Sequence, residues 1–147
     1  MEKQLHDTFV DLERGTPGWF TWSVRILPIG ILGQFLSAGI ALFQDGGLWS
    51  LHATVGGALS LPVVALACGA LFIGRLRGFG WWVGLILLFY LIQIALAVGS
   101  TSWSLSFHPL NGALLLATSF VLLGKVERRR ARSIVFADKM VDAEQVT

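Results

Sequence analysis

Four stretches of apolar residues alternate with short polar segments along the chain. They cover roughly residues 26–43, 51–73, 81–98 and 107–123. Each approaches the roughly 20 residues that an α-helix needs to cross a hydrocarbon core of about 30 Å. A membrane helix satisfies its backbone hydrogen bonds internally, and no stretch shows the two-residue alternation of a membrane β-barrel. The pattern therefore predicts an all-α integral membrane protein, a four-helix bundle of up-down-up-down topology.

The composition supports a membrane protein and suggests three parts. Hydrophobic residues make up 54% of the 147 residues and charged residues 14%, whereas soluble domains carry about 25% charged residues. We expect an N-terminal segment over residues 1–22, a transmembrane domain over 23–125 and a basic tail over 126–147. Pro28 and Pro62 fall inside apolar stretches, where membrane helices tolerate proline as a kink.

The basic residues predict the orientation of the helices. They all fall at the two chain ends or between the second and third apolar stretches, namely Lys3, Arg14, Arg25, Arg75, Arg77, Lys125, Arg128, Arg129, Arg130, Arg132 and Lys139. The other two loops carry none, so the positive-inside rule places both termini in the cytoplasm. We expect the run "KVERRRARS" to contact anionic membrane lipid rather than nucleic acid, with a partner-binding tail as the alternative.

Two histidines begin the second and fourth apolar stretches. With the N-terminus inside, His52 and His108 share a depth near the external face, whereas His6 lies in the N-terminal segment. Helices two and four are diagonal in such a bundle, and neighbouring axes 8–10 Å apart give a diagonal of roughly 13 Å. That gap is too wide for direct contact between imidazoles and suits a flat metal cofactor with one imidazole on each face.

A glycine follows each histidine by four residues, and a glutamine lies in the helix before it. Gly56 and Gly112 share a helix face with their histidines and would let a porphyrin approach the backbone. Gln34 and Gln93 complete two similar hairpins. Because buried amides need partners, these glutamines either bond between helices or contact a haem substituent or a quinone head group.

Three further polar or aromatic residues lie near the same membrane depth. We expect Asn111 beside the cofactor, where it either caps a helix or bonds across the bundle. Pro109 suits a first helical turn, which would place His108 near the N-cap. Trp49 and Trp103 fit an interfacial aromatic belt and would line the edge of a cofactor there.

The arrangement of Gln34, "HATVG", Gln93 and "FHPLNGALL" resembles an uncharacterised prokaryotic family of four-helix membrane proteins, a domain of unknown function. The resemblance covers about residues 20–125, and "HPLNG" is its most specific part. It implies a fold and a multi-pass location in the inner membrane of a prokaryote, but no activity. The paired histidines are more distantly similar to those of b-type membrane cytochromes and haem A synthase. These often hold two haems with four histidines, so two membrane histidines imply one haem at most.

The leading hypothesis is a cytochrome with one haem b, ligated by His52 and His108, that transfers single electrons. Haem iron is commonly held by histidine, and the membrane thickness implies a redox partner protein or a quinone as electron donor. The chain would be an electron-transfer protein rather than a stand-alone enzyme, with no catalytic residues of its own. It would be an accessory subunit of a respiratory or quinol-linked complex, or part of a homo- or hetero-oligomer.

Two other classes of function are compatible with the sequence. One is a cofactor-free structural or assembly subunit whose histidines cap helices and meet the loops. The other is a carrier of divalent metals or small solutes with His52, His108 and Asp45 as ligands. The apolar stretches contain no acidic residue, and such residues often mark transport pathways.

Overall fold

The computed structural model describes residues 11–99 and 101–145, and His6 lies outside them. This part of the chain is all-α, as predicted. Four helical segments are long and apolar enough to cross a membrane: Gly18–Phe43, Gly46–Phe72, Gly74–Val98 and Ser102–Asp138. The chain is therefore a multi-pass membrane protein with four candidate spans.

The described residues form five α-helices and three short 3₁₀ segments. In chain order these are η2 (Leu12–Arg14), α1 (Gly18–Phe43), η3 (Gly46–Leu48), α2 (Trp49–Ala58), α3 (Ser60–Phe72), η4 (Gly74–Phe79), α4 (Gly80–Val98) and α5 (Ser102–Gln145). Helix α1 packs on α2, α3 and α5, while α4 packs on α3 and α5. The second and fourth spans, which carry the two histidines, are thus diagonal, as the up-down-up-down topology predicts.

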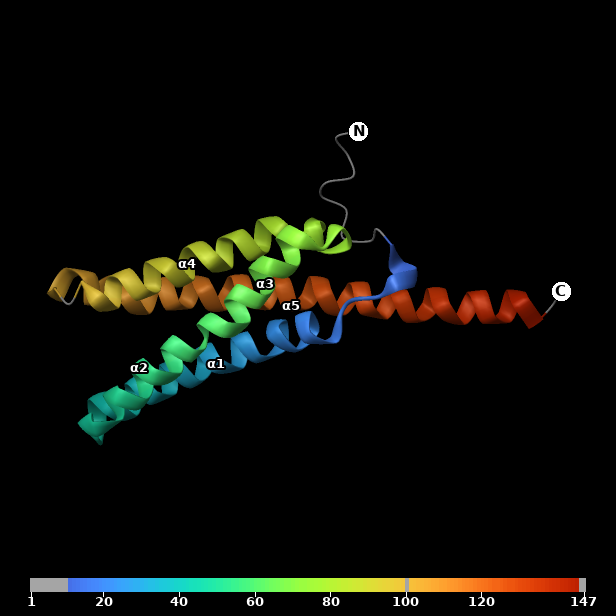
Figure 1. Cartoon of the computed structure of the whole chain (residues 1–147). Coiled ribbons are helices and arrows are strands. Elements are labelled where there is room, and N and C mark those ends of the chain that lie inside the picture. The colour runs from blue at the N-terminus through green and yellow to red at the C-terminus, as the bar shows by residue number, and fades with distance from the viewer. Residues whose placement is uncertain (1–10, 100, 146–147) are drawn as a thin grey trace.

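The core lies at one end of the bundle, and the other end is open. Phe20, Leu66, Phe79, Ile86 and Leu122 are fully buried and come from all four spans. Helix α2, in contrast, has no buried residue and packs mainly on α1, η3 and α3. Figure 1 shows the pair α1–α2 diverging from the pair α4–α5 toward the end with the two hairpin turns.

Close packing at the core end depends on a glycine in α3. A Cβ added at Gly69 would lie 2.8 Å from ring atoms of both Phe20 and Trp19 on α1. Small residues let membrane helices approach closely where lipid-like side chains provide no hydrophobic driving force. Gly69 thus sets the separation of α1 and α3.

The second span is broken between α2 and α3, where the sequence predicts a kink. Pro62 lacks the N–H that would bond the carbonyl of Ala58, and its ring would clash with that carbonyl in a straight helix. The Tyr90 hydroxyl of α4 donates to the carbonyls of Gly56 at 2.9 Å and Gly57 at 3.3 Å. Tyr90 thereby supplies a partner for backbone groups beside the break. Pro28, by comparison, lies within the continuous helix α1.

Helix α5 begins well before His108, so the expectation that His108 lies near its N-cap is wrong. The helix starts at Ser102 and includes Pro109. Thr101 and Ser104 cap it reciprocally: each hydroxyl accepts from the other residue's backbone N–H, at 3.0 and 3.1 Å. This arrangement, equivalent to a capping box, starts the helix upstream and leaves His108 inside it.

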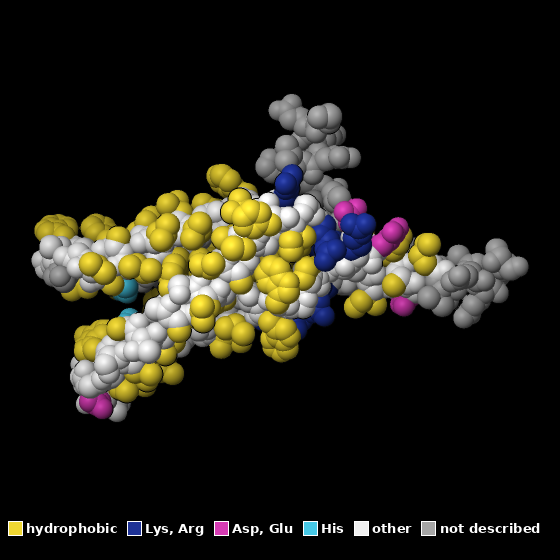
Figure 2. Space-filling view, viewed as in Figure 1, with side chains coloured by type: hydrophobic (Ala, Val, Ile, Leu, Met, Phe, Trp, Pro, Cys, Tyr) yellow, Lys and Arg dark blue, Asp and Glu magenta, His cyan; other side chains and the backbone are white. Residues whose placement is uncertain are grey.

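The described Lys and Arg side chains gather at the core end, where η2 and the extension of α5 also lie (Figure 2). The far end of α5 and the start of the described chain are therefore on the same side of the bundle (Figure 1). Such gathering agrees with the pattern on which the positive-inside rule rests. The cytoplasmic location of this side stays a prediction.

Candidate cofactor site between the two hairpins

A cavity of about 400 Å³ lies between the two hairpins in the open half of the bundle. Many of its lining residues are small, which leaves the space between the helices empty. The wall includes Ala38, Ala53, Gly56, Gly57, Ala97 and Gly112, together with both histidines and both glutamines. In Figure 2 the two histidine side chains face each other across the gap between the diverging arms.

His52 and His108 approach each other more closely than the helix spacing predicts. Their ring centres are 6.3 Å apart and their planes are inclined by 55°. The rings lie closer than the roughly 13 Å expected between diagonal helix axes, because both side chains point into the space between the helices.

A serine on α1 fixes the hydrogen-bonding state of His52. The Ser37 hydroxyl donates to the carbonyl of Gln34 at 3.1 Å and lies 3.1 Å from His52 Nδ1. A hydroxyl has one proton; with that proton on the Gln34 carbonyl, the His52 tautomer that fits the contact donates from Nδ1–H to the Ser37 oxygen. In the neutral imidazole this leaves Nε2 with a free lone pair, the state in which histidine binds metals.

His108 has no such anchor among the described residues. Its Nδ1 is buried and lacks a hydrogen-bond partner in that part of the chain. A buried nitrogen without a partner costs free energy unless a water, an ion or a ligand meets it. The two imidazoles therefore differ, since one is tied at Nδ1 and the other is not.

Gln34 bonds within the first hairpin and fills the space beside its glycine. The Gln34 side-chain amide is oriented so that both its nitrogen and its oxygen have a hydrogen-bond partner. In this orientation Nε2 donates to the carbonyl of His52 at 3.0 Å and Oε1 accepts from the Gly56 N–H at 3.3 Å. A Cβ at Gly56 would lie 3.1 Å from the terminal amide group of Gln34. The lack of a side chain at Gly56 therefore serves mainly to accommodate Gln34, although both residues also line the cavity.

The second hairpin repeats this arrangement with an added asparagine. A Cβ at Gly112 would lie 3.3 Å from Gln93 Nε2 and 3.3 Å from Phe35. Asn111 Nδ2 donates to Gln93 Oε1 at 2.6 Å and to the carbonyl of Phe89 at 2.8 Å. Asn111 thus bonds across to α4 and is not part of the cavity wall.

Of the two tryptophans expected at the site, one contacts a histidine. Trp49 meets His52 edge to face, with ring centres 5.5 Å apart. Trp103 is 75% exposed and stacks on Phe107, and it does not line the cavity.

Ser37 and Tyr90 are the polar residues of this region that the sequence reasoning missed. Each lies three residues from a glutamine, Ser37 after Gln34 and Tyr90 before Gln93. Residues three apart share a helix face. Polar side chains at that spacing from a buried glutamine were therefore the available signal.

The donors present do not form a complete metal site from protein side chains. Within the described residues no group of three or more His, Cys, Asp or Glu side chains comes together. Asp45 instead accepts from the Gly47 N–H at 2.8 Å and caps η3. Two facing imidazoles with no third donor suit an ion whose remaining ligands come from a macrocycle such as a porphyrin.

The fold and this site define a class, a four-helix multi-pass membrane protein with a two-histidine cavity between its hairpins. Residues 34–102 match the model of a family of unknown function (DUF6220). This supports the resemblance to an uncharacterised family in its coarse form. The match includes Gln34, His52 and Gln93 but ends before His108. A search of curated proteins and a search of solved structures each find no significant match.

Proposed function

We propose that the chain binds one haem b between His52 and His108 and serves as a single-electron carrier near the external face of the membrane. The observation that carries this proposal is the pair of imidazoles, 6.3 Å apart, at the wall of a cavity of about 400 Å³. Pockets of roughly 300–1,000 Å³ commonly hold small ligands and cofactors.

The separation of the rings agrees with axial ligation of one ion. Metal–imidazole bonds of about 2.0–2.1 Å, each continued by roughly 1 Å from nitrogen to ring centre, put the two centres about 6 Å apart. His52 Nε2 has its lone pair available because Nδ1 donates to Ser37.

The chain contributes position, dryness and tuning, while the iron porphyrin supplies reversible one-electron chemistry when bound. The cavity wall is mainly apolar, with two histidines, two glutamines and Tyr90 as its polar residues. The described basic side chains lie at the other end of the bundle (Figure 2). The described basic side chains would therefore not pair with a cofactor held between His52 and His108.

A single haem near one face needs a partner, because the hydrocarbon core is about 30 Å thick. An external donor, a quinol at the same depth or the haem of a neighbouring subunit would complete the path. The exposed α2, which buries no residue, is where we place that partner. Membrane lipid covers the remaining faces.

A cofactor-free structural or assembly subunit is the second candidate. It is favoured by the hydrogen bonds of Gln34, Gln93 and Asn111, which lie within the hairpins. In that case the cavity would be closed by a lipid chain or by a partner helix.

Visible spectroscopy of the purified protein distinguishes these candidates. The protein is produced with ample haem supply, and its oxidised and reduced spectra are recorded in detergent. We expect a sharp reduced α-band and a low-spin ferric EPR signal, whereas a colourless preparation would overturn the haem proposal. Reduction by a membrane-impermeant reductant added outside, with oriented vesicles, tests which face holds the site.

A further inference from the structure

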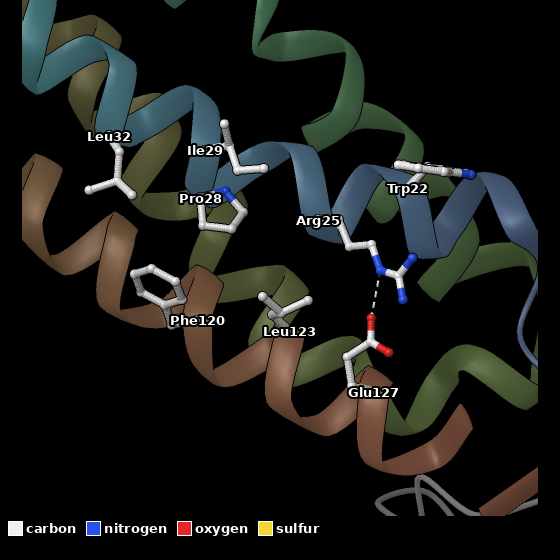
Figure 3. Close-up of a pocket in the computed structure, with 8 residues that line it drawn as sticks. All are labelled: Trp22, Arg25, Pro28, Ile29, Leu32, Phe120, Leu123 and Glu127. Atoms are coloured by element: carbon white, nitrogen blue, oxygen red, sulfur yellow. Dashed lines mark hydrogen bonds and ion pairs between the residues drawn. The ribbon is translucent and has the colours of Figure 1, made fainter. Parts of the chain in front are cut away.

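A second cavity lies on the outer surface between α1 and α5, at the basic end of the bundle. Its volume is about 410 Å³. One part of its wall is apolar, formed by Pro28, Ile29, Leu32, Phe120 and Leu123, and the polar part comes from Arg25 and Glu127, with Trp22 beside them. Figure 3 shows the apolar side chains along one stretch of the two helices and the ion pair beyond them. We call this cavity the α1–α5 groove.

The polar end of the groove pairs Arg25 with Glu127, and Arg130, which bonds Glu127 but does not line the groove, adds a second positive charge. Arg25 Nε donates to Glu127 Oε1 at 2.7 Å, and Arg130 Nη1 donates to Glu127 Oε2 at 3.2 Å. One carboxylate thus sits between two guanidinium groups. All three side chains are more than one-third exposed, so the cluster can meet a ligand from the membrane surface.

Within the described part of the chain, Arg25 is held in place by an ion pair that uses one of its donors. A guanidinium has five N–H donors, and the ion pair with Glu127 uses the Nε–H. The Trp22 ring covers one face of the guanidinium, with its centre 5.7 Å from the central carbon. A guanidinium fixed in this way is preorganised to bind a phosphate through two parallel hydrogen bonds.

The length of the groove fits a lipid chain. Arg25 and Leu32 lie seven residues apart on α1, which corresponds to roughly 10 Å along a helix axis at 1.5 Å per residue. One leaflet contributes about half of a hydrocarbon core of about 30 Å. The apolar wall is therefore long enough to contact most of the length of an acyl chain when the lipid head group lies level with Arg25.

We propose that the α1–α5 groove binds one anionic glycerophospholipid, with an acyl chain along Pro28, Leu32 and Phe120 and the phosphate on Arg25 and Arg130. Charge complementarity selects this occupant, because basic pockets between membrane helices on the cytoplasmic side favour anionic head groups. The site is independent of the haem proposal. It lies at the opposite end of the bundle and uses none of the residues around His52 and His108.

Native mass spectrometry of the full chain in detergent tests this site. The probes are phosphatidylglycerol and phosphatidylcholine with identical acyl chains. We expect one phosphatidylglycerol to stay bound, with at least about five-fold higher affinity than phosphatidylcholine, the factor that corresponds to one basic residue at the surface. Equal affinities would mean that ordinary lipid covers the groove, and would overturn the proposal.

Two variants at the polar end should change the affinity for phosphatidylglycerol in opposite directions. Arg25→Gln should lower the affinity for phosphatidylglycerol about five-fold or more, whereas Glu127→Gln should raise it because the competing carboxylate is gone. Lys125→Gln is the matched control: it removes a positive charge two residues before Glu127 on α5, where Lys125 lies over Trp82. If Lys125→Gln weakens binding as much as Arg25→Gln, the effect is general surface charge and the site is refuted.

Variants of the apolar wall test whether the chain enters the groove. Leu32→Trp should fill it and release the phosphatidylglycerol, while Leu36→Trp, on an exposed position of α1 outside the groove, should not. Equal loss in both variants, or in neither, would contradict an acyl chain in this groove.

Discussion

The two hairpins of the bundle have the same design but hold their histidines differently. In each, a glutamine of the first helix packs on the glycine that follows the histidine of the second helix by four residues. In the first hairpin, Ser37 fixes His52 and Gln34 bonds to the helix backbone. In the second, Asn111 holds Gln93, and His108 Nδ1 has no partner among the described residues. The two hairpins therefore share the glutamine–glycine contact and differ at Nδ1 of their histidines.

Removal of either histidine is the largest perturbation of this frame. His52→Ala and His108→Ala should each abolish the low-spin haem spectrum, because each removes one of two axial ligands. His52→Met should keep a low-spin spectrum and raise the reduction potential, as Met/His ligation does in cytochromes c. Absorption spectra and potentiometry measure both effects.

His6→Ala is the control, since this residue lies far from the cavity in sequence and is not expected to bind iron. Persistence of an unchanged low-spin spectrum in either His52→Ala or His108→Ala would show that the ligand assignment is wrong.

Loss of the Tyr90 hydroxyl should weaken the first hairpin more than the second. Tyr90→Phe leaves the carbonyls of Gly56 and Gly57 without their partner from α4. We expect the free energy of unfolding to fall by about 1 kcal/mol, within the range for interhelical hydrogen bonds in membranes. Unfolding in mixed detergent micelles measures the loss.

Hydrogen exchange shows where the effect of Tyr90→Phe is located. Protection should fall around the α2–α3 break and stay unchanged around Asn111. A uniform change across both hairpins would contradict the role that we assign to Tyr90.

Adjacent glycines of α2 provide a matched pair. The Cβ of Gly56→Ala would lie 3.1 Å from the Gln34 side chain, whereas Gly57 has nothing within 4 Å of that position. Gly56→Ala should therefore cost up to about 1 kcal/mol, while Gly57→Ala should be neutral or slightly stabilising because alanine is the better helix former. Thermal unfolding followed by circular dichroism compares them. Equal effects would mean that the glutamine–glycine contact is not part of the frame.

Loss of the Ser37 hydroxyl should have the smallest effect, which is limited to the reduction potential of the haem. A hydrogen bond at Nδ1 increases the basicity of a ligating imidazole, so its loss in Ser37→Ala should raise the haem potential. A bond of about 1 kcal/mol corresponds to some tens of millivolts for one electron. Potentiometry of Ser37→Ala against Ser23→Ala, a serine of α1 whose hydroxyl bonds the carbonyl of Trp19, checks it. Equal haem potentials in the two variants would show that the Ser37 hydroxyl does not anchor His52.

The membrane fold followed from sequence because each apolar stretch independently has the length of a span. The packing of spans two and four on a diagonal followed from the short loops between them. The break at Leu59 was indicated by Pro62, but its extent was not, since the Tyr90 bond that supports it joins residues far apart in sequence. The start of α5 was misplaced because the Thr101–Ser104 capping pair lies outside the apolar stretch.

The candidate site was partly visible in the sequence. The histidine–glycine spacing identified His52 and His108, and their shared depth brought them together. The glycines were assigned to a porphyrin because side-chain packing cannot be read from spacing, whereas the structure gives their faces to Gln34 and Gln93. Trp103 was expected at the cavity on the basis of its depth, but its direction around α5 takes it to Phe107.

One measurement addresses the central claim most directly. It records the low-spin ferric EPR spectrum and the electron–nuclear double-resonance spectrum of the purified protein. The protein is prepared once with natural histidine and once with ¹⁵N-labelled histidine, and the ratio of haem to chain is determined. We predict one haem per chain and two histidine nitrogens bound to its iron. A ratio near zero, or an iron with fewer than two histidine nitrogens, would contradict ligation by His52 and His108.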